Sequence, residues 1–176
     1  ARYLGPEEYG KYNYVLSFVA LFSFISTLGL EQIIVRDLTQ YSKQENDIMG
    51  TALFLRFIGS LLLNILVILL IIILDIKTKD IKIYIIIVSV GYFFKSFDII
   101  IYYYRSKVKS KFSTIPIIVS IILISLIKIF LILTNKTLIY FISLNTISYL
   151  MNGIFLILSY NIKSDLKIIN WNIRVN

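Results

Sequence analysis

The sequence predicts an all-α integral membrane protein, a polytopic bundle of five transmembrane helices. Hydrophobic residues make up 58% of the 176 positions, charged residues only 16%, and the mean hydropathy is +0.83. A typical soluble domain is about 45–50% apolar and about 25% charged, so one water-soluble core of this size could not bury the excess. Five separate stretches are also apolar over about 20 residues, the length that a membrane-spanning helix needs.

The five predicted spans follow one another with short connections. In chain order they cover residues 12–30, 51–74, 83–104, 115–133 and 138–160. Isoleucine-rich runs would also suit buried strands, but these runs are too long for strands and lack the alternating polarity of a membrane β-barrel. We expect consecutive helices to be antiparallel neighbours. The connection 31–50 is longer, and its first part can continue the first helix beyond the bilayer.

The distribution of Lys and Arg predicts the orientation, because cytoplasmic loops carry an excess of these residues. Nine cations fall on the side of the 31–50 connection, the 105–113 loop and the tail, against six on the other side. The densest cluster, RSKVKSK, places that loop and the tail in the cytoplasm and Ala1 outside. Residues 1–160 are then the transmembrane bundle, and 161–176 is a cytoplasmic linker. An outside start without a signal peptide leads us to expect one further helix upstream.

Several function classes are excluded by composition and motifs. The chain has no cysteine and no histidine, so it carries no disulfide, no Cys/His zinc site and no Ser-His-Asp triad. It also lacks a P-loop, a GxGxxG motif and a cluster of paired carboxylates. The net charge of +8 is explained by basic loops that orient the protein and meet anionic lipid, rather than by binding to nucleic acid.

Ionisable residues inside the predicted spans are the candidate functional groups. Each costs about 2.5–3.5 kcal/mol on insertion scales, so each needs a reason. Four stand out: Arg56, Lys95, Asp98 and Lys128. They could line a polar cavity that receives a negative ligand. Alternatively, Lys95 and Asp98, three residues apart on one helix face, neutralise each other. Arg56 and Lys128 could likewise extend from positions near helix ends to the headgroups.

Uncharged small and polar residues inside the spans are predicted to pack helices together, because they allow close approach and hydrogen bonding between helices. They include Ser26, Asn64, Ser89, Asn145, Asn152 and the glycines at 29, 59, 91 and 153. Tyrosines cluster at span ends, as in YYY at 102–104, and are interpreted as interfacial belts.

Three segments carry a family resemblance. The opening, ARYLGPEEYGKYNYVLSFVALFSFISTLGLEQIIVRDL, contains R-x-LGPEEYG-x-Y, a later LGL and a V-R-D-L exit. The second segment is GTALFLRFIGSLL, and in the third, SFDIIIYYYRSKVKSKFS, an acid precedes aromatics and a basic run. Together they resemble the bacterial polysaccharide biosynthesis (O-antigen, or oligosaccharide repeat-unit) flippases of the MATE-like exporter superfamily. Arg105 replaces a glutamine often found there, and Trp171 resembles the segment leading into a seventh helix.

This resemblance implies both an architecture and a function. The chain would be most of one six-helix half of a twelve-to-fourteen-helix transporter, with 161–176 linking it to a C-terminal half. Such proteins move polyprenyl-diphosphate-linked oligosaccharide repeat units across the inner membrane for O-antigen, capsule or related surface polysaccharide. No bond is made or broken, so we expect no enzyme, no cofactor and no metal, although a proton or sodium gradient could drive transport.

The resemblance also implies partners and binding residues. The expected partners are lipid-linked oligosaccharide, membrane lipid and, in the same process, a polysaccharide polymerase and chain-length proteins. The cations would replace the hydration of the anionic headgroup, which cannot cross hydrocarbon unaided. The substrate-path candidates, in order, are Lys95 and Asp98, then Arg56, Arg36 and Lys128.

Three alternatives remain open from the sequence. A small-molecule exporter of the same superfamily would be favoured by an excess of cavity acids, whereas this chain has more cations. A membrane polysaccharide polymerase usually needs a large external loop, and the external connections here are only a few residues long. A structural subunit would leave the intramembrane charges unexplained.

Overall fold

The computed structural model describes residues 3–164 and 171–173 and confirms the all-α prediction, since these residues contain helices and no strand. Four helical segments are long and apolar enough to cross a membrane, and a fifth is counted if the bent pair Gly5–Leu21 and Ser23–Gln40 is one span. The elements are α1 (Gly5–Leu21), α2 (Ser23–Thr27), α3 (Glu31–Gln40), η1 (Ser42–Gln44), α4 (Glu45–Ile73), α5 (Lys79–Phe94), η2 (Lys95–Asp98), α6 (Ile99–Ser106), α7 (Lys111–Leu133) and α8 (Leu138–Lys163).

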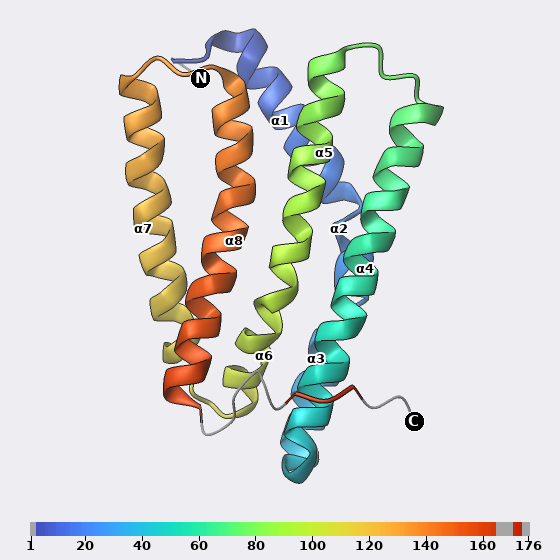
Figure 1. Ribbon diagram of the computed structural model, residues 1–176, viewed down its shortest axis with the longest axis vertical. Coiled ribbons are helices and arrows are strands. Elements are labelled where there is room, and N and C mark those ends of the chain that lie inside the picture. The colour runs from blue at the N-terminus through green and yellow to red at the C-terminus, as the bar shows by residue number, and fades with distance from the viewer. Residues whose placement is uncertain (1–2, 165–170, 174–176) are drawn as a thin grey trace.

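The helices form a row with one crossing segment behind it. Figure 1 shows α7, α8, α5–α6 and α4 side by side, while α1, α2 and α3 run behind α5 and α4. The connections 41–44 and 107–110 lie at one end, here called the loop end. The connections 74–78 and 134–137 lie at the opposite, far end, where the Tyr3 hydroxyl donates to the Lys136 carbonyl at 3.0 Å. Consecutive spans are therefore antiparallel, as predicted.

Several helices extend further than the apolar runs do. α1 begins at Gly5 rather than at 12, α4 at Glu45 rather than at 51, and α7 at Lys111 rather than at 115. The added turns are polar, and carboxylates in the first turns of α1 and α4 interact favourably with the helix dipole. α3 confirms that the first part of the predicted 31–50 connection continues as helix, and η1 and the start of α4 fill most of the rest, so little of it is loop.

The first predicted span, 12–30, is bent rather than straight. α1 and the segment Ser23–Gln40 meet at 47°. Further along, Leu28 and Gly29 have φ of 50° and 63°, a left-handed conformation that only glycine adopts freely. A Cβ on Gly29 would meet nothing within 4 Å. The prediction that Gly29 packs against another helix is therefore wrong, and its role is to turn the chain into α3.

The other three glycines confirm the packing prediction, because each admits a close neighbour. A Cβ on Gly59 would lie 2.8 Å from the Ile25 carbonyl oxygen of the segment behind α4. Gly91 of α5 faces α8, and Gly153 of α8 lies against the end of α5. Near Gly91, the Thr146 hydroxyl of α8 donates to the Ile87 carbonyl of α5 at 2.7 Å. Close backbone approach and interhelical hydrogen bonds thus hold these helices together.

Pro116 lies inside α7, because this helix begins at Lys111. The predicted span began at 115 and would have placed the proline at the start of the helix. Proline has no amide hydrogen, so the carbonyl four residues earlier, on Phe112, loses its helical donor. The Ser159 hydroxyl of α8 donates to that carbonyl at 2.6 Å. A neighbouring helix therefore satisfies the freed backbone group, as proteins require in a bilayer.

Buried apolar side chains form two separate clusters along the molecule. The far-end cluster includes Val19, Leu63 and Ile142, and the loop-end cluster is rich in aromatic residues. In the loop-end cluster Tyr102, Tyr103, Tyr104 and Tyr160 are each at most 8% exposed. The interpretation of 102–104 as an interfacial belt is therefore wrong, because these residues are buried in the bundle. The rings of Tyr103 and Tyr104 contact Tyr160 of α8, and the Trp171 ring meets Tyr160 edge-on.

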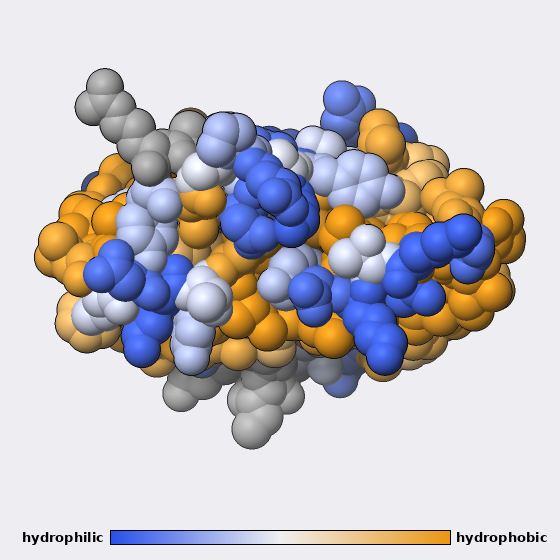
Figure 2. All heavy atoms as spheres, turned by 90° about the horizontal axis from the view of Figure 1, so that it is seen from above, coloured by the Kyte–Doolittle hydropathy of each residue, from blue (hydrophilic) through white to orange (hydrophobic). Residues whose placement is uncertain are grey.

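The outer sides of the bundle are apolar, as expected for a chain surrounded by lipid. Large hydrophobic side chains are exposed along α4 and along almost the whole of α7. Figure 2, viewed onto the far end, shows hydrophilic residues over that end and hydrophobic residues around its rim. Apolar sides and polar ends together fit a multi-pass membrane protein.

Candidate functional site

A layer of polar side chains separates the two apolar clusters near the middle of the bundle. On α4 the layer lies between Ala52 of the loop-end cluster and Leu63 of the far-end cluster. On the neighbouring span it lies between Tyr92 and Ile99. We call it the polar layer and define it by Ser26 of α2, Arg56 and Ser60 of α4, and Lys95, Ser96 and Asp98 of η2.

The polar layer includes a break in the third span. Between α5 and α6, η2 winds as a 3₁₀ turn, and the amide of Ile99 donates to the carbonyl of Ser96, three residues back. This leaves the Lys95 carbonyl, four residues back, available to accept from Arg56 Nη2 at 2.8 Å. A 3₁₀ stretch inside a helix often marks a hinge or a strained sequence, and here a side chain of α4 takes over the displaced carbonyl.

Arg56 is the most deeply buried charge in the described residues, at 1% exposure. Its nearest carboxylate is Asp98, with 4.0 Å between Nη2 and Oδ2. Within the described part of the chain, Nε and Nη1 are buried and have no hydrogen-bond partner. A guanidinium offers five donors, so this one has unused capacity to bind an anion.

The alternative in which Arg56 extends to the headgroups is wrong. Because α4 begins at Glu45, Arg56 lies eleven residues into the helix, about 16 Å from its start. The side chain points across to the neighbouring span, where it contacts the Lys95 carbonyl and approaches Asp98.

Lys95 and Asp98 make no direct ion-pair contact among the described residues, although the charges of both Lys95 and Arg56 act on Asp98. Asp98 instead faces Arg56 from another helix. The Lys95 ammonium lies 5.1 Å from the ring centroid of Tyr92 and 5.3 Å from that of Tyr149. Two aromatic faces therefore stabilise this cation where no carboxylate pairs with it.

Three serines connect the polar layer across three helical segments. The Ser60 hydroxyl donates to the Tyr92 carbonyl at 3.0 Å and lies 3.2 Å from the hydroxyls of both Ser26 and Ser96. One turn further, Asn64 and Ser89 exchange hydrogen bonds between α4 and α5. The packing roles predicted for Ser26, Asn64 and Ser89 are thus confirmed.

Sequence reasoning missed Ser60 and Ser96. The signal that could have found Ser60 is spacing, since Arg56, Ser60 and Asn64 recur every four residues and so share one helix face.

Two asparagines on α8 also carry buried polar atoms. Asn145 and Asn152 lie between Ile142 and Leu156, which belong to the two apolar clusters. Within the described residues, Asn145 Nδ2 and Asn152 Oδ1 are buried without a hydrogen-bond partner. Asn145 lines the hollow that Lys128 also lines, so it belongs with that hollow rather than with the polar layer.

The structure does not bring Arg36 or Lys128 to the polar layer. Arg36 is 63% exposed on α3 and pairs with its neighbour Asp37 at 3.0 Å. Lys128 is exposed on α7, 5.8 Å from the ring centroid of Tyr12. It lines two adjoining hollows of about 130 and 80 Å³ between α1, α7 and α8, which also contact Phe141. Lys128 therefore marks a separate groove towards the far end.

The sequence was compared with protein-family models, with curated proteins and with solved structures. The model of the family described as "Polysaccharide biosynthesis protein" matches residues 1–170. The chain belongs to this family. Comparison with curated proteins and with solved structures gave no significant match.

Membership of the polysaccharide biosynthesis family gives the polar layer a chemical context. The family match covers every residue of the layer and both apolar clusters. Arg56 and Lys95 bring two cations against one carboxylate into an otherwise apolar interior. Such a layer can hold an anion at mid-depth by charge-assisted hydrogen bonds, which are roughly twice as strong as neutral ones.

Proposed function

We propose that this chain is part of a bacterial flippase of the MATE-like superfamily. It would move polyprenyl-diphosphate-linked oligosaccharide repeat units across the inner membrane for O-antigen, capsule or related surface polysaccharide. Family membership supports a role in polysaccharide biosynthesis. The observation that carries the transport step is Arg56, buried at 1% exposure with two guanidinium nitrogens unpartnered among the described residues.

The physical need for such a protein lies in the substrate. A sugar chain and a diphosphate lose their hydration in hydrocarbon, at a cost of several kcal/mol per unsatisfied group. In our proposal, Arg56 and Lys95 contact the diphosphate while the polyprenyl tail stays in lipid. Asp98 positions Arg56 or exchanges a coupling proton or sodium ion. Arg36 and Lys128, which lie outside the polar layer, would be outer contacts along the path.

The rest of the proposal concerns assembly and mechanism. The chain would supply most of one half of a transporter whose two halves rock to expose the substrate path to each side in turn. The 3₁₀ turn at η2 would bend during this motion. A polysaccharide polymerase and chain-length proteins would act on the delivered repeat units, and no covalent chemistry is assigned to this chain.

Deletion of the full-length gene in its host tests the proposal. We expect loss of surface polysaccharide together with accumulation of lipid-linked repeat units on the inner leaflet, because synthesis continues while translocation stops. The measurement is glycan staining combined with leaflet-specific detection of the repeat unit. Loss of glycan while single repeat units still reach the outside would indicate a polymerase. Unchanged glycan would favour a drug or metabolite exporter.

The proposed orientation is tested by cysteine labelling, since the chain has no cysteine of its own. Ser110→Cys at the loop end and Lys77→Cys at the far end both replace exposed residues. In a cysteine-free full-length protein, we expect a membrane-impermeant maleimide to label position 77 in spheroplasts and position 110 only after permeabilisation. Labelling of position 110 from outside would reverse the orientation.

A further inference from the structure

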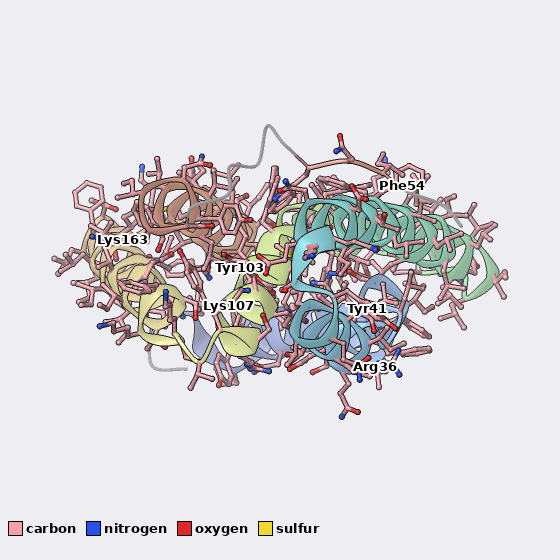
Figure 3. All side chains as sticks on the ribbon, turned by 90° about the horizontal axis from the view of Figure 1, so that it is seen from below. Arg36, Tyr41, Phe54, Tyr103, Lys107 and Lys163 are labelled. Carbon is pink, nitrogen blue, oxygen red and sulfur yellow. The ribbon has the colours of Figure 1, made fainter. Side chains whose placement is uncertain are left out.

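A basic pocket lies at the loop end, away from the polar layer. Its cavity of about 300 Å³ is lined by Glu45, Tyr103, Tyr104, Lys107, Lys109, Lys163 and Ser164. Figure 3, viewed onto this end, shows Tyr103 and Lys107 near its middle and Lys163 to one side. The three lysines come from different places, namely the residue after α6, the following turn and the last turn of α8.

The backbone holds two of these lysines in fixed positions. Val108 adopts a left-handed φ of 57°. The turn is closed by Lys107 N donating to the Tyr103 carbonyl at 3.2 Å and by Lys109 N donating to the Tyr104 carbonyl at 2.9 Å. The lysines therefore start from a fixed backbone at the end of α6, above the rings of Tyr103 and Tyr104. A preorganised backbone lowers the cost of ordering side chains around a ligand.

The charges of the pocket do not balance. Its one carboxylate, Glu45, is 10% exposed and is already paired with Lys107. Among the described residues Lys109 and Lys163 have no ion-pair partner, and both are exposed. Among the described residues that line the cavity, three ammonium groups stand against one carboxylate, which gives two surplus positive charges. Ammonium groups are compact donors that suit phosphate oxygens.

We propose that this pocket binds the phosphate of a membrane lipid headgroup at the loop end. Basic pockets near a membrane surface bind such headgroups, whereas scattered loop lysines act only as a diffuse positive field. Here the rings of Tyr103 and Tyr104 and the three lysines line one partly open cavity beside the apolar ends of α6, α7 and α8. The phosphate can belong to an ordinary anionic phospholipid or to a polyprenyl diphosphate. The proposal holds whether or not the protein is a flippase.

Binding to the purified full-length protein tests the site without any transport assay. The probes are phosphatidylglycerol and polyprenyl diphosphate, each titrated in detergent and followed by native mass spectrometry, with phosphatidylcholine as the neutral reference. We expect Lys109→Gln with Lys163→Gln to weaken binding of the phosphate probes about tenfold, because two charge-assisted contacts are lost. Tighter binding of polyprenyl diphosphate identifies the substrate headgroup as the ligand, and equal binding identifies membrane phospholipid.

Two further variants separate a built site from general surface charge. Lys43→Gln with Lys111→Gln removes the same charge from exposed positions at the same end that do not line the pocket, and we expect less than a twofold change. Glu45→Gln removes the one carboxylate among the described lining residues, so phosphate binding should become tighter. Equal weakening by both lysine pairs, or no effect of Lys109→Gln with Lys163→Gln, would overturn the proposal.

Discussion

The double variant Arg56→Leu, Asp98→Asn is expected to fold more stably than either single variant and to lose transport. The unaltered pair is costly, because Arg56 is 1% exposed and lies 4.0 Å from the carboxylate. Replacing a buried ion pair by well-packed hydrophobic residues is often neutral or stabilising, by about 1–4 kcal/mol, because neither charge is then left buried alone. A charge kept at that cost needs a function, and the proposed function is to contact the diphosphate.

The single variants should behave differently from the double variant. Asp98→Asn leaves the Arg56 guanidinium without its carboxylate, and breaking a buried pair in this way costs about 3–5 kcal/mol. Arg56→Leu removes the group that donates a hydrogen bond to the Lys95 carbonyl, and it leaves Asp98 without its ion-pair partner. The midpoint of thermal unfolding in detergent should therefore fall for Asp98→Asn and recover in the double variant. Repeat-unit translocation should be lost in Arg56→Leu and in the double variant.

The control is an ion pair on the surface of the same protein. Glu7→Gln with Lys11→Gln removes a pair with a 2.8 Å contact in which Glu7 is 84% exposed. Exposed pairs contribute little to stability because solvent screens them, so neither stability nor transport should change. If the Arg56→Leu, Asp98→Asn variant transports normally, the pair serves only helix packing, and the polar layer is not the diphosphate site.

Hydropathy located the four straight spans, and the fifth if the bent pair of the first span is counted as one, but not their ends or bends. The spans are detected because each has about 20 apolar residues, and the bilayer requires that length. The helix ends were misplaced because residues such as Glu45 and Lys111 continue a helix without adding hydrophobicity. The bend of the first span lies at Phe22, between α1 and α2, and the turn into α3 depends on the backbone angles of Leu28 and Gly29. Nothing in an apolar run predicts these angles.

The sequence identified the charged residues of the polar layer but not the residues that each of them contacts. Arg56, Lys95 and Asp98 stand out because a charge within an apolar run is rare. The spacing of Lys95 and Asp98 along one helix suggested that these two residues form an ion pair. In the structure the carboxylate of Asp98 instead lies 4.0 Å from the guanidinium of Arg56 on another helix. Ser96 went unnoticed because serine is an ordinary residue in a transmembrane helix. Only the packing of α4 against η2 shows that it joins the network.

Gly59→Leu is expected to destabilise the protein by about 1–3 kcal/mol or more, the cost of overpacking a core, and to abolish transport. A Cβ at this position would lie 2.8 Å from the Ile25 carbonyl oxygen and 2.9 Å from that of Ser26. Both are backbone atoms and cannot rotate away. The segment behind α4 must therefore shift, which separates the hydroxyls of Ser26 and Ser60, now 3.2 Å apart.

The same substitution at Gly10 should have the opposite sign, which makes it a matched control. Gly10 lies inside α1, and a Cβ there would meet nothing within 4 Å. Leucine is a better helix former than glycine by roughly 0.5–1 kcal/mol, so the melting temperature should hold or rise. At Gly59 the same propensity gain is smaller than the clash with α2. Equal melting temperatures for the two variants would mean that α2 and α4 are not in close contact and that the polar layer does not depend on Gly59.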